Sequence, residues 1–423
     1  MNPGHQRGLH RSSSGVYLDS VACYATTNVS FVIEQRGSRA VIRRSSPRRG
    51  VKSDAQRRVV QSMLDIAGVQ IDGGQPFDIR VNDPRLYSAV LGNGTLGLGE
   101  SYMDGWWDCP ALDQFFERVL TAGLEEHMPR SKALLWAVLQ ARVLNPQRLS
   151  KAFEIGERHY DIGNDLFVKM LDKGLNYSCG YWESAATLDQ AQEAKLDLIC
   201  RKLGVRDGMR ILDIGCGWGG FATYAAKQYG AHVTGVSVSR EQIDLARERS
   251  AGLPVDFELL DYRSISGSFD RIVSIGMFEH VGVNNYRTFM EVAHRSLAKD
   301  GLMLLHTIGR NMSGRTTDPW IAKYIFPNSM IPSAKQITTA AEGLFTLEDW
   351  HNFGADYDPT LMAWYERFRD SWDSIKDGYD ERFYRMWTYY LLSCAASFRV
   401  RRNQVWQVVL SLGGVKGGYR SAR

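Results

Sequence analysis

The residues with the clearest chemical potential stand together in the stretch R-I-L-D-I-G-C-G-W-G-G, residues 210–220. Its short apolar start predicts a buried parallel strand with Asp213 near its end, and its glycines predict a tight turn into a helix over residues 221–228. Glycine lets the backbone approach a ligand closely, and a helix start offers free N–H groups and a positive dipole end. This geometry suits a nucleotide-like ligand. The G-x-G-x-x-G spacing of dinucleotide-binding proteins is also met. The alternative is a turn with a purely structural role.

Other ionisable side chains follow the next predicted strands. Glu279 stands in F-E-H at the carboxyl end of one strand, and His306 stands in H-T-I-G at the end of another. A histidine in an apolar strand is more often a satisfied core residue, but two such groups at adjacent strand ends are costly unless they are partnered or used. Cys179 and Cys394 have apolar surroundings, which is typical of buried structural thiols. Tyr357, in D-Y-D, is ambiguous taken alone.

Small polar residues could bond a sugar and a base. The second predicted strand ends in G-V-S without an acidic residue for ribose hydroxyls, so Ser237, Ser239 and Gln242 are the candidates instead. Ser239 is equally suited to be a plain helix N-cap. Asp261 and Tyr262 follow the third predicted strand and could flank an adenine, with an ordinary turn as the alternative.

These residues need a sheet to position them. Strand and helix patterns alternate along the second half of the chain, which predicts βαβ units and a parallel sheet covered on both faces. Ligands of such sheets bind at the carboxyl ends of the strands, where the candidate residues stand. The predicted strands are residues 210–214, 232–237, 255–260, 269–275, 301–308 and 405–411, and the predicted helices between them are residues 221–228, 240–250 and 283–297.

The rest of the chain divides into three parts. Residues 1–50 have Ser and Arg clusters and few periodic apolar positions, and are expected to be disordered or a start-site artefact. Residues 51–150 are expected to form an N-terminal domain for lipid docking or dimerisation, and residues 151–423 the catalytic domain. The remaining predicted elements are helices at 55–67, 84–91, 112–124, 132–144, 187–203, 361–370, 379–392 and 395–401, a strand at 77–81, a packed loop or aromatic docking surface at 92–108, a domain boundary near 145–149, and an insertion containing 328–333 and 349–357.

Composition excludes several classes of protein. The 423 residues contain no run of about 18 apolar residues, so no spanning helix is expected. Six cysteines without a C-x-x-C pair argue against a zinc site or a disulfide framework and favour a reducing cytoplasm. Residues 1–60 carry eleven Lys/Arg and three Asp/Glu, a net charge of +8, so the remainder carries −4. The basic end lacks interleaved aromatics, which disfavours a nucleic-acid enzyme.

Several motifs together resemble the cyclopropane-fatty-acyl-phospholipid synthases, a family within the class I S-adenosylmethionine (SAM)-dependent methyltransferases. The resemblance runs from about residue 55 to the C-terminus and implies an α/β fold: a Rossmann-like, mostly parallel seven-stranded sheet, a smaller α+β N-terminal domain and a helical, aromatic-rich lid. The missing ribose acid also fits this family. The motifs are L-G-L-G-E-S-Y-M-D-G-W-W, H-Y-D-I-G-N-D-L-F, Y-S-C, L-D-I-G-C-G-W-G-G, G-M-F-E-H-V-G, L-L-H-T-I-G and W-H-N-F-G-A-D-Y.

The resemblance implies a reaction and a set of residues. The SAM methyl group goes to a cis double bond of a phospholipid acyl chain, and the cation loses a proton to a bound bicarbonate and closes to a cyclopropane. Glu279 is then expected to be protonated or to share a proton, with help from His306, since an ionised carboxylate would repel the anion. The bicarbonate ligands would be Cys179, Glu279, His306, Ile308 through its backbone and Tyr357, with Cys394 lining the pocket. The SAM site would comprise Tyr177, Ser178, Asp213, Gly215, Cys216, Gly217, Ser237, Ser239, Gln242, Asp261 and Tyr262.

The resemblance also implies partners. We expect a homodimer that binds the inner face of the membrane peripherally from the cytoplasm and needs no metal. The alternatives are a related methyltransferase that makes methyl-branched acyl chains or acts on a small amine, and a non-catalytic SAM-binding or lipid-docking protein. The retained set of ionisable residues argues against the non-catalytic alternative.

Overall fold

The computed structural model describes residues 49–124 and 163–423. By its internal contacts the chain separates into a unit of residues 1–52 and a compact unit of residues 53–423. The helix expected at 132–144 and the boundary expected near 145–149 lie outside the described residues, as does nearly all of the expected tail.

The N-terminal part of the larger unit is mostly helical. The stretch 92–108, expected to be a loop or docking surface, instead continues helix α2 to Met103 across a kink at Gly94, which has φ 58° and ψ −132°. Trp107 is fully buried, with its ring 5.0 Å from that of Tyr102, so this tryptophan belongs to the core. The expected strand at 77–81 is reduced to two residues. The elements are α1 (Arg49–Ile66), β1 (Arg80–Val81), α2 (Arg85–Met103), β2 (Trp107–Asp108) and α3 (Leu112–Thr121).

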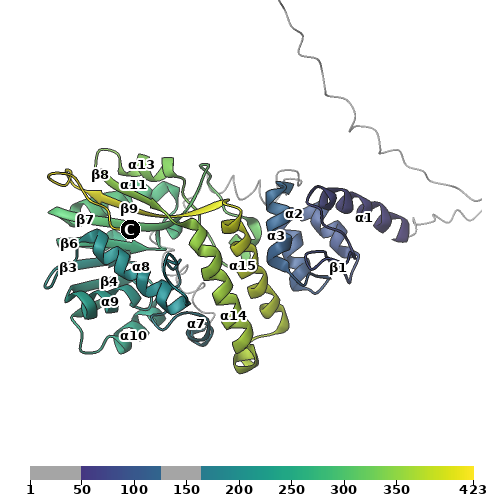
Figure 1. Ribbon diagram of the computed structural model, residues 1–423, viewed down its shortest axis with the longest axis horizontal. Coiled ribbons are helices and arrows are strands. Elements are labelled where there is room, and N and C mark those ends of the chain that lie inside the picture. The colour runs from purple at the N-terminus through teal and green to yellow at the C-terminus, as the bar shows by residue number, and fades with distance from the viewer. Residues whose placement is uncertain (1–48, 125–162) are drawn as a thin grey trace, which may run out of the picture. The chain divides into compact units, whose positions relative to one another are not determined.

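The predicted seven-stranded, mostly parallel sheet is confirmed. Its strand order is β5-β4-β3-β6-β7-β9-β8, in which the first five strands run parallel and β9 runs antiparallel to both of its neighbours (Figure 1). The order changes direction between β3 and β6, so a crevice forms at the carboxyl ends of these two strands. The strands are β3 (Arg210–Ile214), β4 (His232–Ser237), β5 (Val255–Leu259), β6 (Phe269–Ile275), β7 (Leu297–Arg310), β8 (Thr346–Asn352) and β9 (Asn403–Ser411).

Helices cover both faces of the sheet (Figure 1). Alternate strand residues face opposite layers, so Ile211 packs in the core under α8, α9 and α10, whereas Leu212 packs in the core under α11 and α13. Thr187 caps the start of α8 by accepting a hydrogen bond from the amide of Gln190, and Gly204 ends it in the left-handed conformation. The helices are α7 (Asn164–Met170), α8 (Leu188–Leu203), α9 (Gly220–Tyr229), α10 (Arg240–Arg249), α11 (Tyr286–Ser296), α12 (Pro319–Tyr324), α13 (Ala334–Ala341), α14 (Tyr357–Ile375) and α15 (Glu381–Arg399).

The C-terminal third holds two helices that the sequence patterns did not predict, α12 and α13, and it departs from the expectation in other places as well. Residues 349–352, expected within an insertion, belong to the edge strand β8, whose sequence T-L-E-D-W-H-N lacks an apolar run because only one strand borders it. The two helices expected at 379–392 and 395–401 are one continuous helix, α15. Ser393 does not break this helix because its hydroxyl donates to the carbonyl of Tyr390 within the same turn.

One arginine connects the N-terminal helices with the C-terminal ones. Arg399 on α15 forms ion pairs with Asp113 and Glu117 of α3, at 2.9 and 3.0 Å, and with Asp358 of α14, at 2.9 Å. The neighbouring contacts are apolar, since α3 packs along α15 with Phe116 against Tyr389. These segments therefore share one core, although they lie far apart in the sequence.

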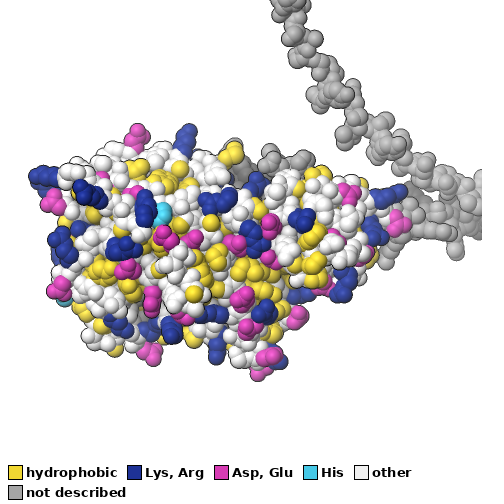
Figure 2. Space-filling view, viewed as in Figure 1, with side chains coloured by type: hydrophobic (Ala, Val, Ile, Leu, Met, Phe, Trp, Pro, Cys, Tyr) yellow, Lys and Arg dark blue, Asp and Glu magenta, His cyan; other side chains and the backbone are white. Residues whose placement is uncertain are grey.

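Two features that bear on function are absent from the described residues. Among residues 49–124 and 163–423, no helix combines the length and the apolar character needed to cross a bilayer. The same ranges hold no group of three or more His, Cys, Asp or Glu side chains arranged for a metal ion. On the face shown in Figure 2, basic and acidic side chains are interspersed over the folded part instead of forming a surface of one sign.

Candidate active site

The turn after β3 requires glycine. Gly215, Gly217 and Gly219 all have positive φ, at 87°, 53° and 77°. A Cβ on Gly215 would lie 2.6 Å from the Cβ of Met277, so a side chain there meets both strain and a clash. The backbone of β3 therefore turns sharply below the start of α9 and leaves space beside it.

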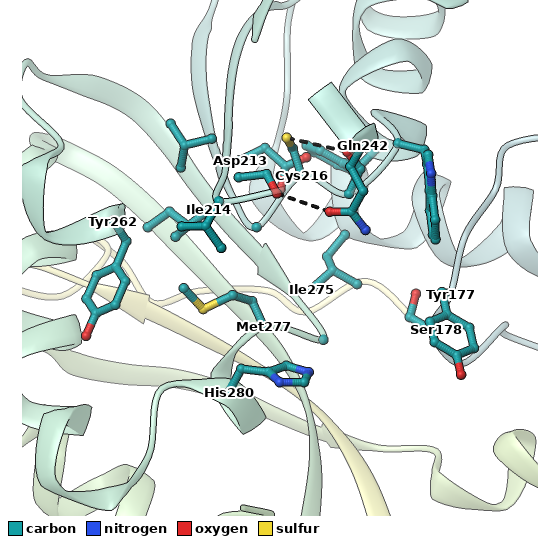
Figure 3. Close-up of a pocket in the computed structure, with 18 of the residues that line it drawn as sticks. Tyr177, Ser178, Asp213, Ile214, Cys216, Gln242, Tyr262, Ile275, Met277 and His280 are labelled. Atoms are coloured by element: carbon teal, nitrogen blue, oxygen red, sulfur yellow. Dashed lines mark hydrogen bonds between the residues drawn. The ribbon is translucent and has the colours of Figure 1, made fainter. Parts of the chain in front are cut away.

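That space is a cavity of about 190 Å³, here called the glycine-turn cavity. Figure 3 shows side chains from the ends of β3, β4 and β6 and from the loop before α8 converging on it. Ten of the eleven residues expected at the SAM site line it: Tyr177, Ser178, Asp213, Gly215, Cys216, Gly217, Ser237, Gln242, Asp261 and Tyr262.

Ser239 is the residue of that set which does not line the cavity. Its hydroxyl accepts a hydrogen bond from the amide of Gln242 and so caps α10, which was the alternative reading of its position. The hydroxyl of Ser237 donates to Oε1 of Gln242 at 3.1 Å, so these two cavity residues bond each other in this structure. The polar end of β4 is thus organised by side chains that can bond hydroxyl groups, without a carboxylate.

Two carboxyls lie in the cavity wall in different electrostatic settings. Asp213 is buried, and burial raises its pKa to about 7 while the nearby ammonium of Lys195 opposes that rise. Asp261 instead accepts hydrogen bonds from the backbone and the guanidinium of Arg263, both at 2.9 Å. Tyr262, the residue between Asp261 and Arg263, packs its ring 5.4 Å from that of Phe289. Asp213 is therefore the carboxyl most sensitive to the charge of whatever occupies the cavity.

The residues expected to hold an anion do not line this cavity. Four of the five expected ligands, Cys179, Glu279, Ile308 and Tyr357, form a separate group with the expected wall residue Cys394, here called the Glu279 cluster. The fifth expected ligand is His306. Oε1 of Glu279 accepts a hydrogen bond from the amide of Ile308 at 2.6 Å, and Oε2 is buried without a hydrogen-bond partner. Burial raises the pKa of Glu279 to about 7. The backbone amide that the resemblance assigned to the anion is thus bound to Glu279 here.

Tyr357 is the centre of the cluster. Burial raises its pKa well above the usual value, and the proximity of Cys179, Glu279 and Cys394 raises it further. Tyr177, which lines the glycine-turn cavity, acts on Tyr357 in the same way, so the cluster adjoins the cavity. Burial also raises the pKa of both thiols, that of Cys394 to about 12. All of these groups are therefore neutral proton donors near neutral pH, apart from the partly ionised Glu279.

His306 lies two residues before Ile308 on β7. It is buried, and Nδ1 lies 3.4 Å from Nε2 of Gln407, the residue beside it on β9. Burial lowers its pKa well below the usual value, and the positive charges of Lys195 and Lys202 add to this. The ring is accordingly neutral, and its edge faces Phe353 at 5.6 Å between centroids.

Aromatic rings fill the space around the cavity and the cluster. The hydroxyls of Tyr177 and Tyr390 are 2.9 Å apart, although the two residues are 213 positions apart in the chain. The ring of Tyr177 lies 5.1 Å from Trp364, and that of Tyr357 lies 5.9 Å from the same tryptophan. This packing leaves the region between the two sites lined by π-faces and shielded from water.

The sequence patterns did not indicate several side chains that belong to this region. His280, rather than its neighbour Glu279, lines the glycine-turn cavity (Figure 3), and the F-E-H motif contained both without indicating which would turn inward. Asn176 also lines the cavity. Lys195 was missed because a lysine in an amphipathic helix is normally solvated; its neighbours at three- and four-residue spacing, Gln192 and Ile199, are buried on the same face.

Comparison with known proteins decides the family. Residues 147–408 match the sequence profile described as "Mycolic acid cyclopropane synthetase". The cyclopropane-fatty-acyl-phospholipid synthase of Escherichia coli K12 is 53% identical over 373 residues, which is 88% of this chain and 97% of that protein. The chain belongs to the cyclopropane synthase family of SAM-dependent methyltransferases.

Other members of the family are similar over shorter stretches. The tuberculostearic acid methyltransferase UfaA1 of Mycobacterium tuberculosis is 34% identical over 342 residues, 75% of this chain and 79% of that one. Among solved structures, the M. tuberculosis cyclopropane synthase MmaA2 has a TM-score of 0.58 at 34% identity and covers 61% of this chain and 97% of its own. The mycolic acid cyclopropane synthase CmaA1, solved with S-adenosylhomocysteine, has a TM-score of 0.57 at 33% identity, with the same coverage.

Proposed function

We propose that this cyclopropane synthase family member transfers a methylene group from SAM to the cis double bond of an unsaturated phospholipid acyl chain and so forms a cyclopropane ring. The observation that carries the proposal is the 53% identity to the E. coli phospholipid enzyme over almost the whole of that protein. The site is compatible with this reaction, because a nucleotide-sized cavity adjoins a buried cluster of proton donors and acceptors.

The glycine-turn cavity is the proposed SAM site. Backbone of the glycine turn and the start of α9 would face the donor, while Ser237 and Gln242 would bond its hydroxyls. The carboxyl of Asp213, buried at the cavity wall, would favour a cationic sulfonium donor over the neutral-sulfur product. That preference would help the product leave after transfer.

An alkene is a weak nucleophile, so the acyl chain must be held close to the methyl group and in line with it. The carbon cation formed by methyl transfer would react with water if water were present. The rings of Tyr177, Tyr357 and Trp364 lie next to one another between the cavity and the cluster. Their π-faces would exclude water and stabilise the positive charge.

The Glu279 cluster fits a small oxyanion such as bicarbonate. Oε2 of Glu279 is a buried polar atom without a partner, and a buried group of this kind usually signals a missing ligand or water. Tyr357 and Cys179 are neutral donors with raised pKa values, as binding an anion requires. When bound, bicarbonate would supply the base that the reaction needs.

The chain's own part in proton handling falls to Glu279 and His306. A pKa of about 7 means that Glu279 is protonated for much of the time at neutral pH, so its carboxyl can donate to an anion instead of repelling it. The neutral ring of His306 adds no positive charge beside the developing cation. Cys394 is a wall residue in this proposal, because a thiol with a pKa of about 12 is a poor nucleophile.

The membrane and oligomer expectations belong to the same proposal. We propose peripheral contact with the phospholipid surface at the inner face of the membrane, and a homodimer. Contact with the bilayer is required by a substrate whose reactive bond lies within the acyl chain. Co-sedimentation with vesicles and light scattering of the purified protein test the two points separately.

One alternative has support of its own. The 34% identity to a tuberculostearic acid methyltransferase keeps open a methyl-branched acyl chain as the product, which would result if the cation lost a proton from a neighbouring carbon of the chain and so kept both the methyl group and a double bond. The same donor site and acyl site would serve both outcomes, so only the product distinguishes them.

The test is a lipid product analysis. Purified protein is incubated with SAM and vesicles of a phospholipid that carries a cis-monounsaturated chain, and the fatty acids are examined by mass spectrometry. A gain of one CH₂ with resistance to double-bond cleavage supports ring formation, whereas a methyl-branched product supports the alternative. Glu279→Ala should bind S-adenosylhomocysteine but form no product. If the protein binds S-adenosylhomocysteine but leaves the lipid unchanged, both reactions are ruled out.

A further inference from the structure

Lys195 occupies an unusual position on α8. Its side chain is completely buried, at 0% exposure, on the helix face that packs against the sheet. Burying an ammonium group is costly unless its protons are bonded and its charge is balanced. Burial lowers its pKa to about 8, which reflects that cost. The structure supplies both kinds of compensation.

The ammonium bonds the loop that borders the glycine-turn cavity. Nζ of Lys195 donates to Oγ of Ser178 at 3.0 Å and to Oδ1 of Asn176 at 3.4 Å. Both acceptors line the cavity, whereas Lys195 is not among the lining residues. The lysine therefore stands behind the cavity wall and fixes the polar atoms of that wall.

A second side chain of α8 bonds the backbone of the same loop. Gln192, almost one turn earlier, donates through Nε2 to the carbonyl of Ser178 at 2.7 Å. Asn176 is also held by Asp172, which accepts from its backbone amide and its side-chain amide, both at 2.8 Å. The loop has no regular secondary structure, so these side chains determine its position.

Charge provides the other compensation. Asp172, Cys179 and Asp213, in that order, each raise the pKa of Lys195 and so oppose the effect of burial. The influence between Lys195 and Asp213 is mutual, because Lys195 lowers the pKa of Asp213. The lysine is thus a buried counter-charge for the carboxyl at the cavity wall.

We propose that Lys195 is a positioning residue for donor binding: its ammonium fixes Asn176 and Ser178 at the wall of the glycine-turn cavity and balances the charge of Asp213. It acts through these residues and does not touch the donor. This inference rests on the proposed function, because it takes the cavity to be the SAM site.

The test compares two buried lysines of one helix. Lys195→Met keeps the length of the side chain and removes its charge and donors. It should raise the Kd of S-adenosylhomocysteine and the KM of SAM about 10- to 100-fold, as expected for lost hydrogen bonds to a charged group, and change kcat at saturating SAM by less than about threefold. Lys202 is also at 0% side-chain exposure but bonds His351 and Asp349 instead, so Lys202→Met should change the KM of SAM by less than about threefold.

A further variant covers loss of folding. Ser178→Ala removes the hydroxyl that accepts from Lys195 without altering α8, and should raise the Kd about 5- to 10-fold; combined with Lys195→Met, the effects should be less than additive. Equal effects of Lys195→Met and Lys202→Met, a fall in kcat alone, or full additivity would overturn the role of Lys195. Failure of the wild-type protein to bind S-adenosylhomocysteine would instead count against the proposed function.

Discussion

The carboxyl of Glu279 accepts a hydrogen bond from the backbone amide of Ile308 at 2.6 Å, which joins the short helical turn after β6 to the neighbouring strand β7. One carboxyl oxygen is thereby fixed, and the other lies buried beside Tyr357 without a partner. One oxygen of this carboxyl therefore has a structural role, and the other is available for chemistry. This division suggests how its protonation and its contribution to folding are connected.

Glu279 should make the protein less stable as the pH rises from about 4.5 to about 7. Its pKa is raised from 4.5 to about 7 in the folded state, so the folded protein binds the proton more tightly than the unfolded chain does. Stability is then highest below pH 4.5 as far as this group is concerned, and declines up to about pH 7. The decline amounts to roughly 3 kcal/mol, since a tenfold change in proton affinity is about 1.4 kcal/mol.

Urea denaturation of the wild type and Glu279→Gln at several pH values measures this contribution. The glutamine keeps an acceptor for the amide of Ile308 and cannot ionise. In the variant, the free energy of unfolding should therefore lose the part of its pH dependence that Glu279 causes. Asp213, whose pKa is also raised to about 7, leaves a residual slope of the same sign. If the free energy of unfolding depends on pH in the same way for both proteins, the pKa of Glu279 is not raised in the folded state.

Tyr357→Phe should reduce turnover without weakening donor binding. The substitution removes a buried hydroxyl from the Glu279 cluster and keeps the ring, which packs 4.5 Å from Phe398. We expect kcat to fall about 10²- to 10³-fold, as for loss of one donor to an anion in a dry site. Initial rates at varied SAM concentrations on unsaturated vesicles give kcat and KM separately.

Tyr389→Phe is the matched control for that experiment. Tyr389 is buried on α15 and packs 4.5 Å from Trp320. Burial raises its pKa, and the member of the Glu279 cluster that adds to this is Cys394, the wall residue. Its kcat should stay within about threefold of the wild type. If both tyrosine variants lost activity to the same extent, general packing rather than the hydroxyl of Tyr357 would be the cause.

Cys394→Ala should leave the enzyme active within about threefold, because burial keeps its thiol protonated and poorly nucleophilic. Cys179→Ala should be much more damaging, since that thiol adjoins Tyr357 in the cluster. The two variants are compared by methyl transfer to vesicles and by the rate of alkylation with iodoacetamide. Loss of all turnover in Cys394→Ala, with SAM binding retained, would assign the thiol a chemical role after all.

Sequence patterns predicted those parts of the fold that depend on local apolar runs. Strands β3, β4 and β6 begin and end where their sequences indicated, because both faces of a central strand are covered and the run is therefore continuous. Strand β8 is an edge strand in which two acidic residues, Glu348 and Asp349, are followed by Trp350 and His351, so its pairing with β9 comes from tertiary contact. The glycine-rich half of α2 is similar: Gly99 is needed because Trp320 packs against it, and no local pattern shows that contact.

The site divides in the same way. The glycine turn and Asp213 were visible as a pattern, since both follow from the geometry of one strand and one helix. The Glu279 cluster draws on β6, β7, α14, α15 and the loop before α8, so only resemblance to a family could gather it. Lys195 eluded both approaches because its burial depends on the loop that folds over α8.

Arg399→Met should destabilise the fold by about 1–3 kcal/mol, because it leaves Asp113, Glu117 and Asp358 without their shared cation. The side chain is 26% exposed, so water screens part of the loss. Arg369→Met removes a half-exposed pair with Asp370 and should change stability by less than about 0.5 kcal/mol. Thermal denaturation followed by circular dichroism compares them, and equal melting temperatures would show that Arg399 adds nothing.

The position of β9 has a consequence for biosynthesis. This strand is the last in the chain, yet it is inserted between β7 and β8. While the ribosome still holds residues 403–411, the edge of β7 has no neighbour on that side and β8 has nothing to pair with. The nascent protein therefore carries an unpaired strand edge on β7 until residues 403–411 have left the ribosome, and the sheet can be completed only after that point.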